Sequence, residues 1–387
     1  MANGGAMGAG AGGRAEDAGG RGAGAGGSAG DSAANAAAAA AAHPLGRAAT
    51  LTDVARHAGV SLATASRVVN GSTRTVNPRM RERVLASAAV LSYTANVQAQ
   101  AVARGTGRTV ALVVGDIADP YFASIASGVS RAAAGRGLTV TIAMTGDGAE
   151  AELAAVAAVR GQRPQAVIMA GSRRTDLAED DPVLAELHAV EALGGTVAFI
   201  GTAVAFDDGS TQRFAGVEVD HRAGARALAQ ALLSAGYRDF GILAGPASLL
   251  TPVDRSAGFV GALSAPDCAP GAGRIVHGPF TRDGGYDAMT RMLAAGPAPE
   301  CVFAVADVMA VGAMAAIREH GLRPGIDVGV AGFDDIPILQ DLAPSLTTVA
   351  LPLVELGERA LEVALGETGD AGPIVGRVIV RESTPGR

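Results

Sequence analysis

Two short helices joined by a tight turn are predicted for residues 50–70, TLTDVARHAGVSLATASRVVN, and no other stretch constrains the fold as strongly. Thr50 is an N-cap residue with an acidic residue three positions later, as in a shortened capping box. Gly59 stands where a helix ends on a residue in the left-handed conformation. Ser61 caps a second helix over residues 62–70, which is too short to bury much apolar surface alone. The spacing predicts a helix-turn-helix unit.

A third helix is predicted after the loop of residues 71–76. Asn77 is its cap and Pro78 its first residue, a position where the missing N–H of proline costs nothing. The helix is expected to run to about Leu91. Three side chains should face the first two helices: Val84, Leu85 and Ala88.

The positive charge of the chain gathers around these helices. Eight arginines and two acidic residues lie between Thr50 and Arg108, so this stretch carries +6 although the whole chain carries −7. The remainder therefore carries −13. A basic helical unit joined to an acidic body is typical of a DNA-binding domain with a separate sensor domain. A small helical bundle that does not bind DNA is the alternative.

Length and composition exclude several classes of protein. The 387 residues allow two or three domains, and residues 1–48 are so rich in Gly and Ala that we expect a disordered tail. No apolar run reaches the roughly 18 residues of a membrane helix, and the N-terminus does not resemble a secretory signal. Cys268 and Cys301 form neither a disulfide framework nor a metal site. We therefore expect a cytoplasmic protein with no metal or other cofactor.

Strands and helices alternate from Arg108 onward, which predicts right-handed βαβ units and parallel sheets. Because about 280 residues exceed one comfortable sheet, we expect two similar lobes with a cleft at the carboxyl ends of the strands. The expected strands are TVALVVGDI, LTVTIAM, QAVIMAGS, TVAFIG, DFGILAGP, CVFAVAD and VGVAGFD. The expected helices cover residues 123–136, 150–160, 254–263 and 309–320.

Three motifs in this order resemble the LacI/GalR family of transcription regulators: VSLATASRVVNG (60–71), DIADPYF (116–122), and AGFDDIP followed by LTTV (331–349). The resemblance covers residues 50–387. It implies an α-helical helix-turn-helix headpiece and an α/β two-lobed periplasmic-binding-protein-like core with parallel sheets.

The resemblance also implies the domain boundaries. The DNA-binding domain is expected at residues 49–95, a hinge segment at 96–107 and the effector-binding core at 108–387. The N-terminal lobe would comprise about 108–215 and 351–379, and the C-terminal lobe about 216–350 and the C-terminal end.

Operator DNA is the first partner that the resemblance implies, with base contacts from Leu62, Ala63 and Arg67. Arg67 can form a bidentate contact with guanine worth about 1–3 kcal/mol, whereas the other two can only touch a thymine methyl group. Phosphate and backbone contacts are expected from Thr50, Ser61, Thr64, Ser66 and Asn70. Ser61 and Asn70 could instead only cap helices.

The hinge of family members folds in the minor groove and wedges a leucine between base pairs. Val102 takes this position here, and Ala99 keeps the small character of the preceding residues. A shorter, β-branched wedge predicts weaker intercalation and less DNA bending.

A small-molecule effector is the second implied partner, bound at the positions Tyr121, Phe122, Thr251, Arg255, Phe280 and Asp334. Arg255 can donate a rigid fork to hydroxyls or a carboxylate, and Asp334 can accept two hydroxyls, as a sugar site needs. Two alternatives stay open: a salt bridge between the lobes formed by Arg255 and Asp334, and plain core packing of Phe122 and Phe280.

Three polar positions of family sugar sites are changed in this chain. Gly201 replaces an acid, Ala306 an asparagine and Leu351 a glutamine. The cleft should therefore hold fewer polar groups than a typical hexose site, and the effector should be smaller, more apolar or differently oriented. A sugar or sugar derivative is expected, and a purine or nucleoside is the alternative.

Other functional classes fit the sequence less well. The chain has neither a dinucleotide-binding fingerprint nor a Walker lysine, and no catalytic set appears, so we expect no enzyme. His221 and His277 stand singly and are expected to be surface or packing residues. A secreted sugar-binding transport protein would share the core but would have no use for residues 50–104.

The expected mechanism is a population shift between relative orientations of the lobes. The effector favours one orientation and so changes whether the hinge segments can pair on the operator. We expect a homodimer, with a tetramer left open, that represses transcription until the ligand releases it. No membrane partner is expected.

Overall fold

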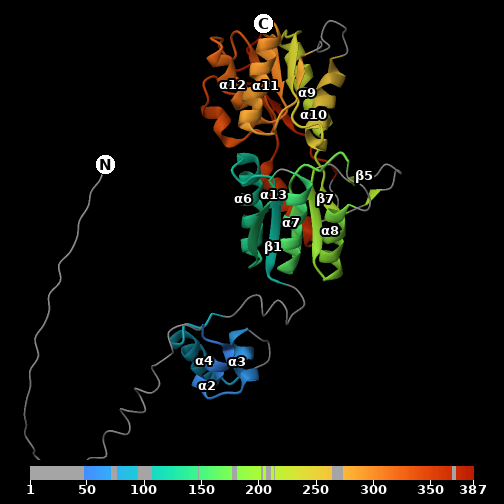
Figure 1. Ribbon diagram of the computed structural model, residues 1–387. Helices are drawn as coiled ribbons and strands as arrows, with labels where there is room; N and C mark the ends of the chain where they lie inside the picture. Colours follow the sequence, from blue (N-terminus) through green and yellow to red (C-terminus); the bar gives the residue numbers. More distant parts are fainter. Residues whose placement is uncertain are drawn as a thin grey trace, which may run out of the picture. The chain divides into compact units, whose positions relative to one another are not determined.

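The computed structural model describes residues 48–70, 76–94, 107–146, 148–176, 181–201, 214–263, 273–367 and 372–387, and the backbone of 204–205 and 211–212. The chain divides into two compact units, Met1–Ala95 and Asn96–Arg387 (Figure 1). Residues 1–47 of the predicted tail and the hinge residues Ala99 and Val102 lie outside the described residues. No helix in the described part is long and apolar enough to cross a membrane.

Three helices form the N-terminal unit: α2 (Leu51–Ala58), α3 (Leu62–Val69) and α4 (Pro78–Val90). The capping box between Thr50 and Asp53 is present, and Gly59 ends α2 in the left-handed conformation with φ 61°. Ser61 caps α3, so the local signals of the sequence set both helix boundaries and the turn between them.

A small apolar core joins the three helices of this headpiece, residues 48–94. Val54, Ala65 and Val84 are buried at its centre, one from each helix. The prediction for Leu85 is wrong, because this side chain is 51% exposed. Helix α4 instead turns Ser87 inward, since positions three and four residues after Val84 share its face and the next residue does not.

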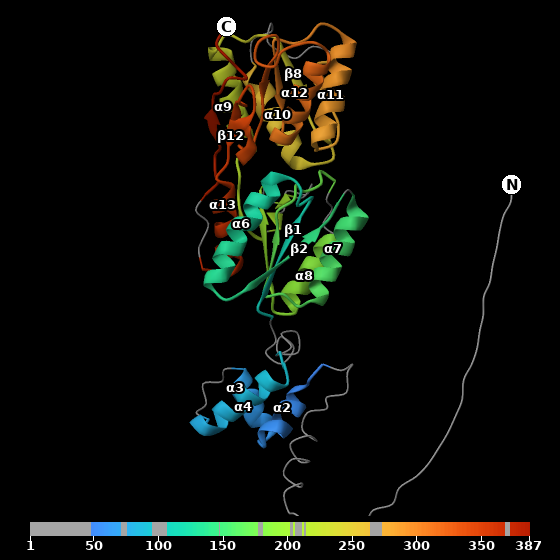
Figure 2. The same ribbon diagram turned by 90° about the vertical axis from the view of Figure 1, so that its left-hand side faces the viewer.

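The N-terminal lobe of the second unit is built on a parallel sheet in the order β2-β1-β3-β4-β7. Its strands are β1 (Thr109–Val114), β2 (Thr139–Met144), β3 (Ala166–Met169), β4 (Thr196–Ile200) and β7 (Ala215–Val217). Helices α6 (Pro120–Gly135) and α13 (Leu353–Ala364) cover one face, and α7 (Ala149–Gly161) and α8 (Pro182–Ala192) the other (Figure 2). A short antiparallel pair, β5 (Val204–Ala205) and β6 (Thr211–Gln212), follows β4.

Helix α13 comes from the far end of the chain and packs tightly on α6. A Cβ atom at Gly128 would lie 2.0 Å from the carbonyl oxygen of Val354, and one at Gly357 would lie 2.2 Å from that of Ile125. Glycine at both positions therefore allows the two backbones to approach, which ties the C-terminal region to the N-terminal lobe.

The C-terminal lobe has a second parallel sheet in the order β11-β10-β8-β9. In its core the ring of Phe259 stacks on that of Phe303 and meets that of Phe240 edge to face. The strands are β8 (Phe240–Leu243), β9 (Ile275–Val276), β10 (Cys301–Ala304) and β11 (Gly329–Ala331). The helices are α9 (His221–Ser234), α10 (Leu250–Ala262), α11 (Arg282–Ala295), α12 (Asp307–Glu319) and the 3₁₀ helix η2 (Pro337–Asp341).

Three chain segments connect the two lobes. The first leads from β7 into α9, the second from β12 (Thr348–Ala350) into α13, and the third from α13 into β13 (Arg377–Ile379), which pairs antiparallel with β12. Val219 and Ile374 form a further bridge between the first and third segments. The predicted α/β core of two lobes with parallel sheets is confirmed.

All four helices predicted for the core begin earlier than expected, and α6 and α10 differ most. Helix α6 starts at Pro120 rather than at residue 123, because the carboxylate of Asp119 accepts the N–H of Tyr121 at 2.9 Å and Pro120 fits the first helical position. Helix α10 starts at Leu250 rather than at residue 254 and has no side-chain cap of its own.

Candidate functional sites

Helix α3 turns three of the predicted DNA-contacting side chains to solvent. Ala65 and Val68 on its inner face are buried, whereas Ala63 and Arg67 are exposed and Leu62 keeps 50% of its surface accessible. Arg67 has no ion pair or hydrogen bond with the residues that the structure describes. Its guanidinium is therefore available to a partner.

The polar residues predicted to contact DNA bond to one another within the headpiece. The Thr50 hydroxyl donates to Asp53 at 2.6 Å, and Asn70 Nδ2 donates to Ser66 Oγ at 3.0 Å. Ser61 Oγ accepts the N–H of Thr64 at 3.2 Å. The capping role that the sequence left open for Ser61 is therefore present, and the contacts of these residues with phosphate remain predictions.

Exposed arginines on α4 extend the positive charge of the headpiece. Arg79 and Arg81 face solvent near the start of the helix, whereas Arg83 donates to the carbonyl oxygen of Ala58 and so holds α4 against α2. Charge of this kind suits the phosphate backbone of a nucleic acid.

A cleft of about 1140 Å³ lies between the two lobes of the core. Its walls come from the carboxyl ends of β1, β3 and β4 in one lobe and of β8, β9 and β11 in the other. This is the edge at which parallel α/β sheets bind ligands. All six predicted effector residues line it: Tyr121, Phe122, Thr251, Arg255, Phe280 and Asp334.

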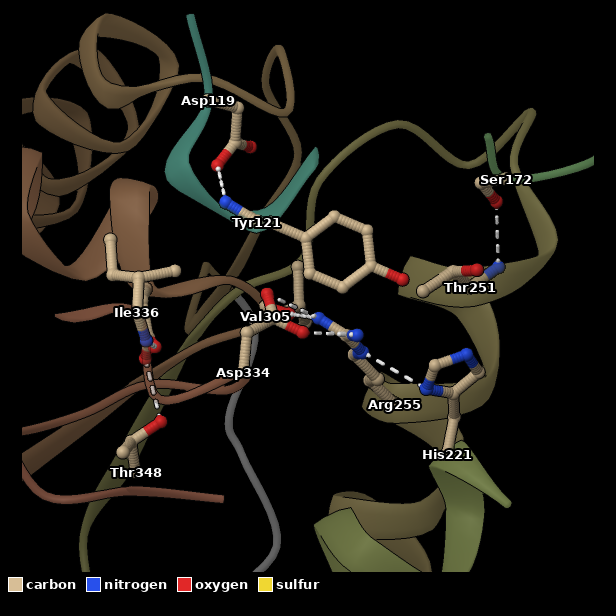
Figure 3. A network of polar contacts seen from close by, with 11 residues as sticks. Asp119, Tyr121, Ser172, His221, Thr251, Arg255, Val305, Asp334, Ile336 and Thr348 are labelled. Carbon is tan, nitrogen blue, oxygen red and sulfur yellow. Dashed lines mark hydrogen bonds and ion pairs between the residues drawn. The ribbon is translucent and has the colours of Figure 1, made fainter. Parts of the chain in front are cut away.

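Arg255 and Asp334 form a buried ion pair in the wall of the C-terminal lobe (Figure 3). Arg255 Nη2 lies 2.6 Å from Asp334 Oδ1, and Nη1 lies 3.2 Å from Oδ2. Nη1 also donates to the carbonyl oxygen of Val305 at 2.7 Å, and the guanidinium lies 4.0 Å from the centre of the Phe333 ring. Both partners belong to the same lobe, so the alternative of a salt bridge between the lobes is wrong.

The loop that carries Asp334 has an unusual backbone. Asp334 has φ 119° and Asp335 φ 59°, conformations that L residues rarely adopt. Hydrogen bonds hold the loop on both sides: Asp334 N donates to Val349 O at 2.8 Å, and Arg381 donates to the Asp335 carboxylate at 2.7 Å. Burial raises the pKa of Asp334 to about 7, and Arg255 limits this rise. These hydrogen bonds maintain the strained backbone conformation, which places the Asp334 carboxylate in the cleft wall.

Aromatic side chains line the cleft from both lobes, Tyr121 and Phe122 from the N-terminal lobe and Phe280 from the C-terminal lobe. Tyr121 and Phe122 lie in the first turn of α6 with their rings 5.0 Å apart, edge to face. Burial raises the pKa of the Tyr121 hydroxyl, so this group stays a neutral donor and acceptor. Phe122 and Phe280 are each only partly buried, so both rings reach the cleft as well as the core.

A short ribbon of hydrogen bonds joins the two lobes beside the cleft. Thr175 N donates to Ser248 O at 2.9 Å and Leu250 N to Arg173 O at 2.8 Å. Ser172 Oγ accepts the N–H of Thr251 at 3.0 Å. Because Leu250 and Thr251 begin α10, the N-terminal lobe caps a helix of the C-terminal lobe.

Sequence reasoning missed several residues of the cleft. Ser172 and Arg174 line it after β3, and His221 lines it at the start of α9. His221 is 3% exposed and its Nδ1 lies 3.3 Å from Arg255 Nε, so it is a packed residue within the site. Gly201 lines the cleft, while Ala306 and Leu351 are buried and are not among its lining residues.

Metal binding finds no support among the described residues, which contain no group of three His, Cys, Asp or Glu side chains suited to hold an ion. Cys301 is buried in β10, where burial raises the pKa of its thiol.

Comparisons with known proteins agree on one family. The model of bacterial regulatory proteins of the lacI family matches residues 50–96, and a periplasmic binding protein-like domain matches residues 229–384. The HTH-type transcriptional regulator GalS of Salmonella typhimurium (strain LT2) is 33% identical over 325 residues, which cover 84% of this chain and 91% of GalS. The chain belongs to the LacI family.

Two solved structures of LacI-family regulators support the same assignment. The Lac repressor dimer bound to operator and the anti-inducer ONPF has 28% identity and a TM-score of 0.70, and it covers 88% of this chain and 100% of its own. A complex of the regulator CelR with cellobiose has 30% identity and a TM-score of 0.60, covering 87% of this chain and 99% of its own.

Membership of the LacI family confirms the function predicted from the sequence. The protein is a DNA-binding transcription regulator with a helix-turn-helix headpiece and an effector-binding core. The alternative of a transport protein is set aside, because residues 50–96 match the headpiece of regulators.

Proposed function

We propose that the protein is a repressor whose operator binding is released by a neutral sugar in the interlobe cleft. The observation that carries the sugar assignment is the pairing of the cleft's charges. Three guanidiniums line the described part of the cleft, and each is paired with a carboxylate: Arg174 with Asp181, Arg255 with Asp334, and Arg282 with Asp283.

An anionic effector would compete with these pairs. Five carboxylates line the cleft against the three guanidiniums, so a phosphate or carboxylate group would meet net negative charge. Arg173, whose guanidinium lies 4.9 Å from the centre of the Phe199 ring, is not among the lining residues. A neutral ligand suits these walls better.

The uncharged groups of the cleft fit a polyhydroxy compound. Each oxygen of Asp334 accepts one bond from Arg255 and keeps capacity for a hydroxyl donor. Tyr121 and Phe280 offer apolar faces for a sugar ring. A volume of about 1140 Å³ accommodates a disaccharide, and the relative CelR was solved with cellobiose. Of the three effectors that the sequence left open (smaller, more apolar or differently oriented), a cleft of this volume does not require the smaller one.

A thermal-shift screen of the full chain tests the effector class. Cellobiose, glucose, galactose and ribose form the neutral set, with glucose 6-phosphate and guanine as competing classes. We expect stabilisation by a neutral sugar, and its loss in Asp334→Asn, which removes the negative charge opposite Arg255 and replaces one acceptor oxygen with a donating NH₂ group. Stabilisation by guanine alone would overturn the sugar assignment.

Operator recognition is proposed for the exposed face of α3, with Arg67 as the base-reading residue. Selection from random DNA with the full-length protein would yield the operator. Arg67→Lys should lose discrimination against altered operators by about ten- to a hundredfold while keeping non-specific binding, because lysine retains the charge but not the fork. Unchanged discrimination would refute this role. Arg81→Ala, off α3, is the control and should weaken all DNA sequences equally.

Effector binding would act through the lobes. A sugar held by both walls favours one relative orientation of the lobes, and the headpieces of a dimer then lose their joint fit to a near-palindromic operator. In an operator-binding assay, addition of the stabilising sugar should raise the Kd for DNA. A lowered Kd would show that the sugar is a corepressor.

A further inference from the structure

His221 lines the cleft, although the sequence predicted only a surface or packing residue at this position. It is the first residue of α9, and its ring is 3% exposed. The ring lies against Phe333, with centroids 5.9 Å apart, and against the guanidinium of Arg255. Both neighbours belong to the C-terminal lobe, so the ring is held in one orientation.

The contact with Arg255 decides where the proton of the imidazole lies. Arginine Nε always carries a hydrogen and can only donate, and it lies 3.3 Å from Nδ1 of His221. Nδ1 must therefore accept, which leaves the proton of the neutral ring on Nε2. Burial and the charge of Arg255 lower the pKa of His221 well below its ordinary value, so the ring is neutral at physiological pH.

The Nε2–H group has no partner among the residues that the structure describes. It points away from Arg255 on the side of Thr251 (Figure 3), and His221 is one of the residues that line the cleft. In the described part of the chain, Nε2 is not one of the fully buried side-chain atoms that lack a partner, so it is reachable from the cleft, where an acceptor of a ligand can bind it.

We propose that His221 is a specificity-determining residue of the effector cleft, which donates from Nε2 to an acceptor oxygen of the ligand. This inference rests on the proposed function, in which a neutral sugar occupies the cleft. Asp334 and His221 flank Arg255 from opposite sides, so the wall presents an acceptor on one side and a donor on the other. The preferred ligand places a hydroxyl donor against Asp334 and a hydroxyl or ring oxygen against His221.

Two substitutions separate a ligand contact from simple support of Arg255. The amide oxygen of His221→Asn can take the place of Nδ1 and accept from Arg255, but its side chain does not reach the position of Nε2. The amide nitrogen of His221→Gln reaches that position and can donate there. If His221 only supports Arg255, Asn should replace it better than Gln. If His221 contacts the ligand, Gln should replace it better.

Calorimetric titration of the full-length protein with cellobiose measures the difference. We expect His221→Asn to weaken binding at least tenfold and His221→Gln by less than fivefold, with operator binding in the absence of sugar retained in both. His320→Asn, at the C-cap of α12 and outside the cleft, is the matched control and should bind as the parent does. Equal affinity of His221→Asn and the parent would overturn the proposal.

The tautomer provides a readout that needs no ligand. Nitrogen-15 NMR of the histidine side chains, with the His221 signals assigned by their loss in His221→Asn, should show the proton on Nε2. A proton on Nδ1 would overturn the proposal even if affinities changed. Should the parent bind none of cellobiose, glucose, galactose and ribose, the proposed function itself would fail and this inference with it.

Discussion

The carboxyl group of Asp307 is expected to make the stability of the core depend on pH. Asp307 is the first residue of α12 and is fully buried. Its Oδ2 accepts the N–H of Ile336 at 3.0 Å, and its Oδ1 lies 2.6 Å from the hydroxyl of Thr348. Burial, followed by the negative charge of Asp334, raises the pKa of Asp307 to about 8.

The sign and size of the effect follow from proton linkage. The folded protein keeps a proton on Asp307 up to about pH 8, whereas an unperturbed aspartate loses it near 3.8. Between these values the folded state binds more protons than the unfolded chain, so the free energy of unfolding falls as the pH rises. For one such site the loss between pH 6 and pH 8 amounts to about 2 kcal/mol.

The substitution Asp307→Asn should abolish this loss, because an amide does not titrate. Its amide oxygen can accept from Ile336, and its NH₂ group can donate to the Thr348 hydroxyl in place of the bond that this hydroxyl donates to Asp307. The assay is urea unfolding of the full chain followed by circular dichroism at pH 6, 7 and 8. The variant should gain about 2 kcal/mol relative to the parent over this range.

Subtracting the free energy of unfolding of the variant from that of the parent removes the pH dependence of groups that do not interact with Asp307. Asp334, whose pKa is also raised, is present in both proteins, and the difference between them therefore measures Asp307 together with its coupling to Asp334. Asp341→Asn is the control, since this carboxylate is exposed in the folded protein. The reasoning is refuted if the difference between parent and Asp307→Asn is the same at pH 6 and pH 8.

Three further substitutions test the fold and the lobe contact. Val84→Ala should lower headpiece stability by about 2 kcal/mol, because two buried methyl groups leave the core of that unit, and scanning calorimetry should show the core transition unchanged. Gly357→Ala should destabilise the core by at least about 2 kcal/mol in urea, because its Cβ would lie 2.2 Å from Ile125 O. Ser172→Ala removes the cap of Thr251, worth about 1 kcal/mol, and should weaken sugar binding roughly fivefold in calorimetry if closure accompanies binding. An unchanged stability in Val84→Ala or Gly357→Ala, or an unchanged sugar affinity in Ser172→Ala, would contradict the contact that the substitution tests.

The headpiece could be predicted from the sequence because its signals are local. The cap at Thr50, the left-handed Gly59 and the cap at Ser61 act within one or two turns of helix, and all three are present in the structure. The error at Leu85 arose because one apolar residue beside Val84 was assigned to the same face, although adjacent helical positions diverge by about 100°.

The cleft could be predicted only in part. The positions of Arg255 and Asp334 came from the resemblance, and both line the cleft. Their mutual pairing within one lobe could not be predicted, because 79 residues separate them and the contact depends on the strained loop after β11. His221 gave no signal at all: a single histidine after a strand has no pattern that distinguishes a cleft residue from a packed one.

The start of α10 shows why lobe contacts escape sequence analysis and why they matter here. Leu249 precedes the helix and offers no side-chain cap, so no local pattern marks Leu250 as its first residue. The N–H groups of Leu250 and Thr251 are instead satisfied by Arg173 and Ser172 of the other lobe. Separation of the lobes would return both groups to water and loosen the first turn of a helix whose next turn carries Arg255. Closure and the order of the cleft wall that carries Arg255 are therefore coupled through one helix terminus.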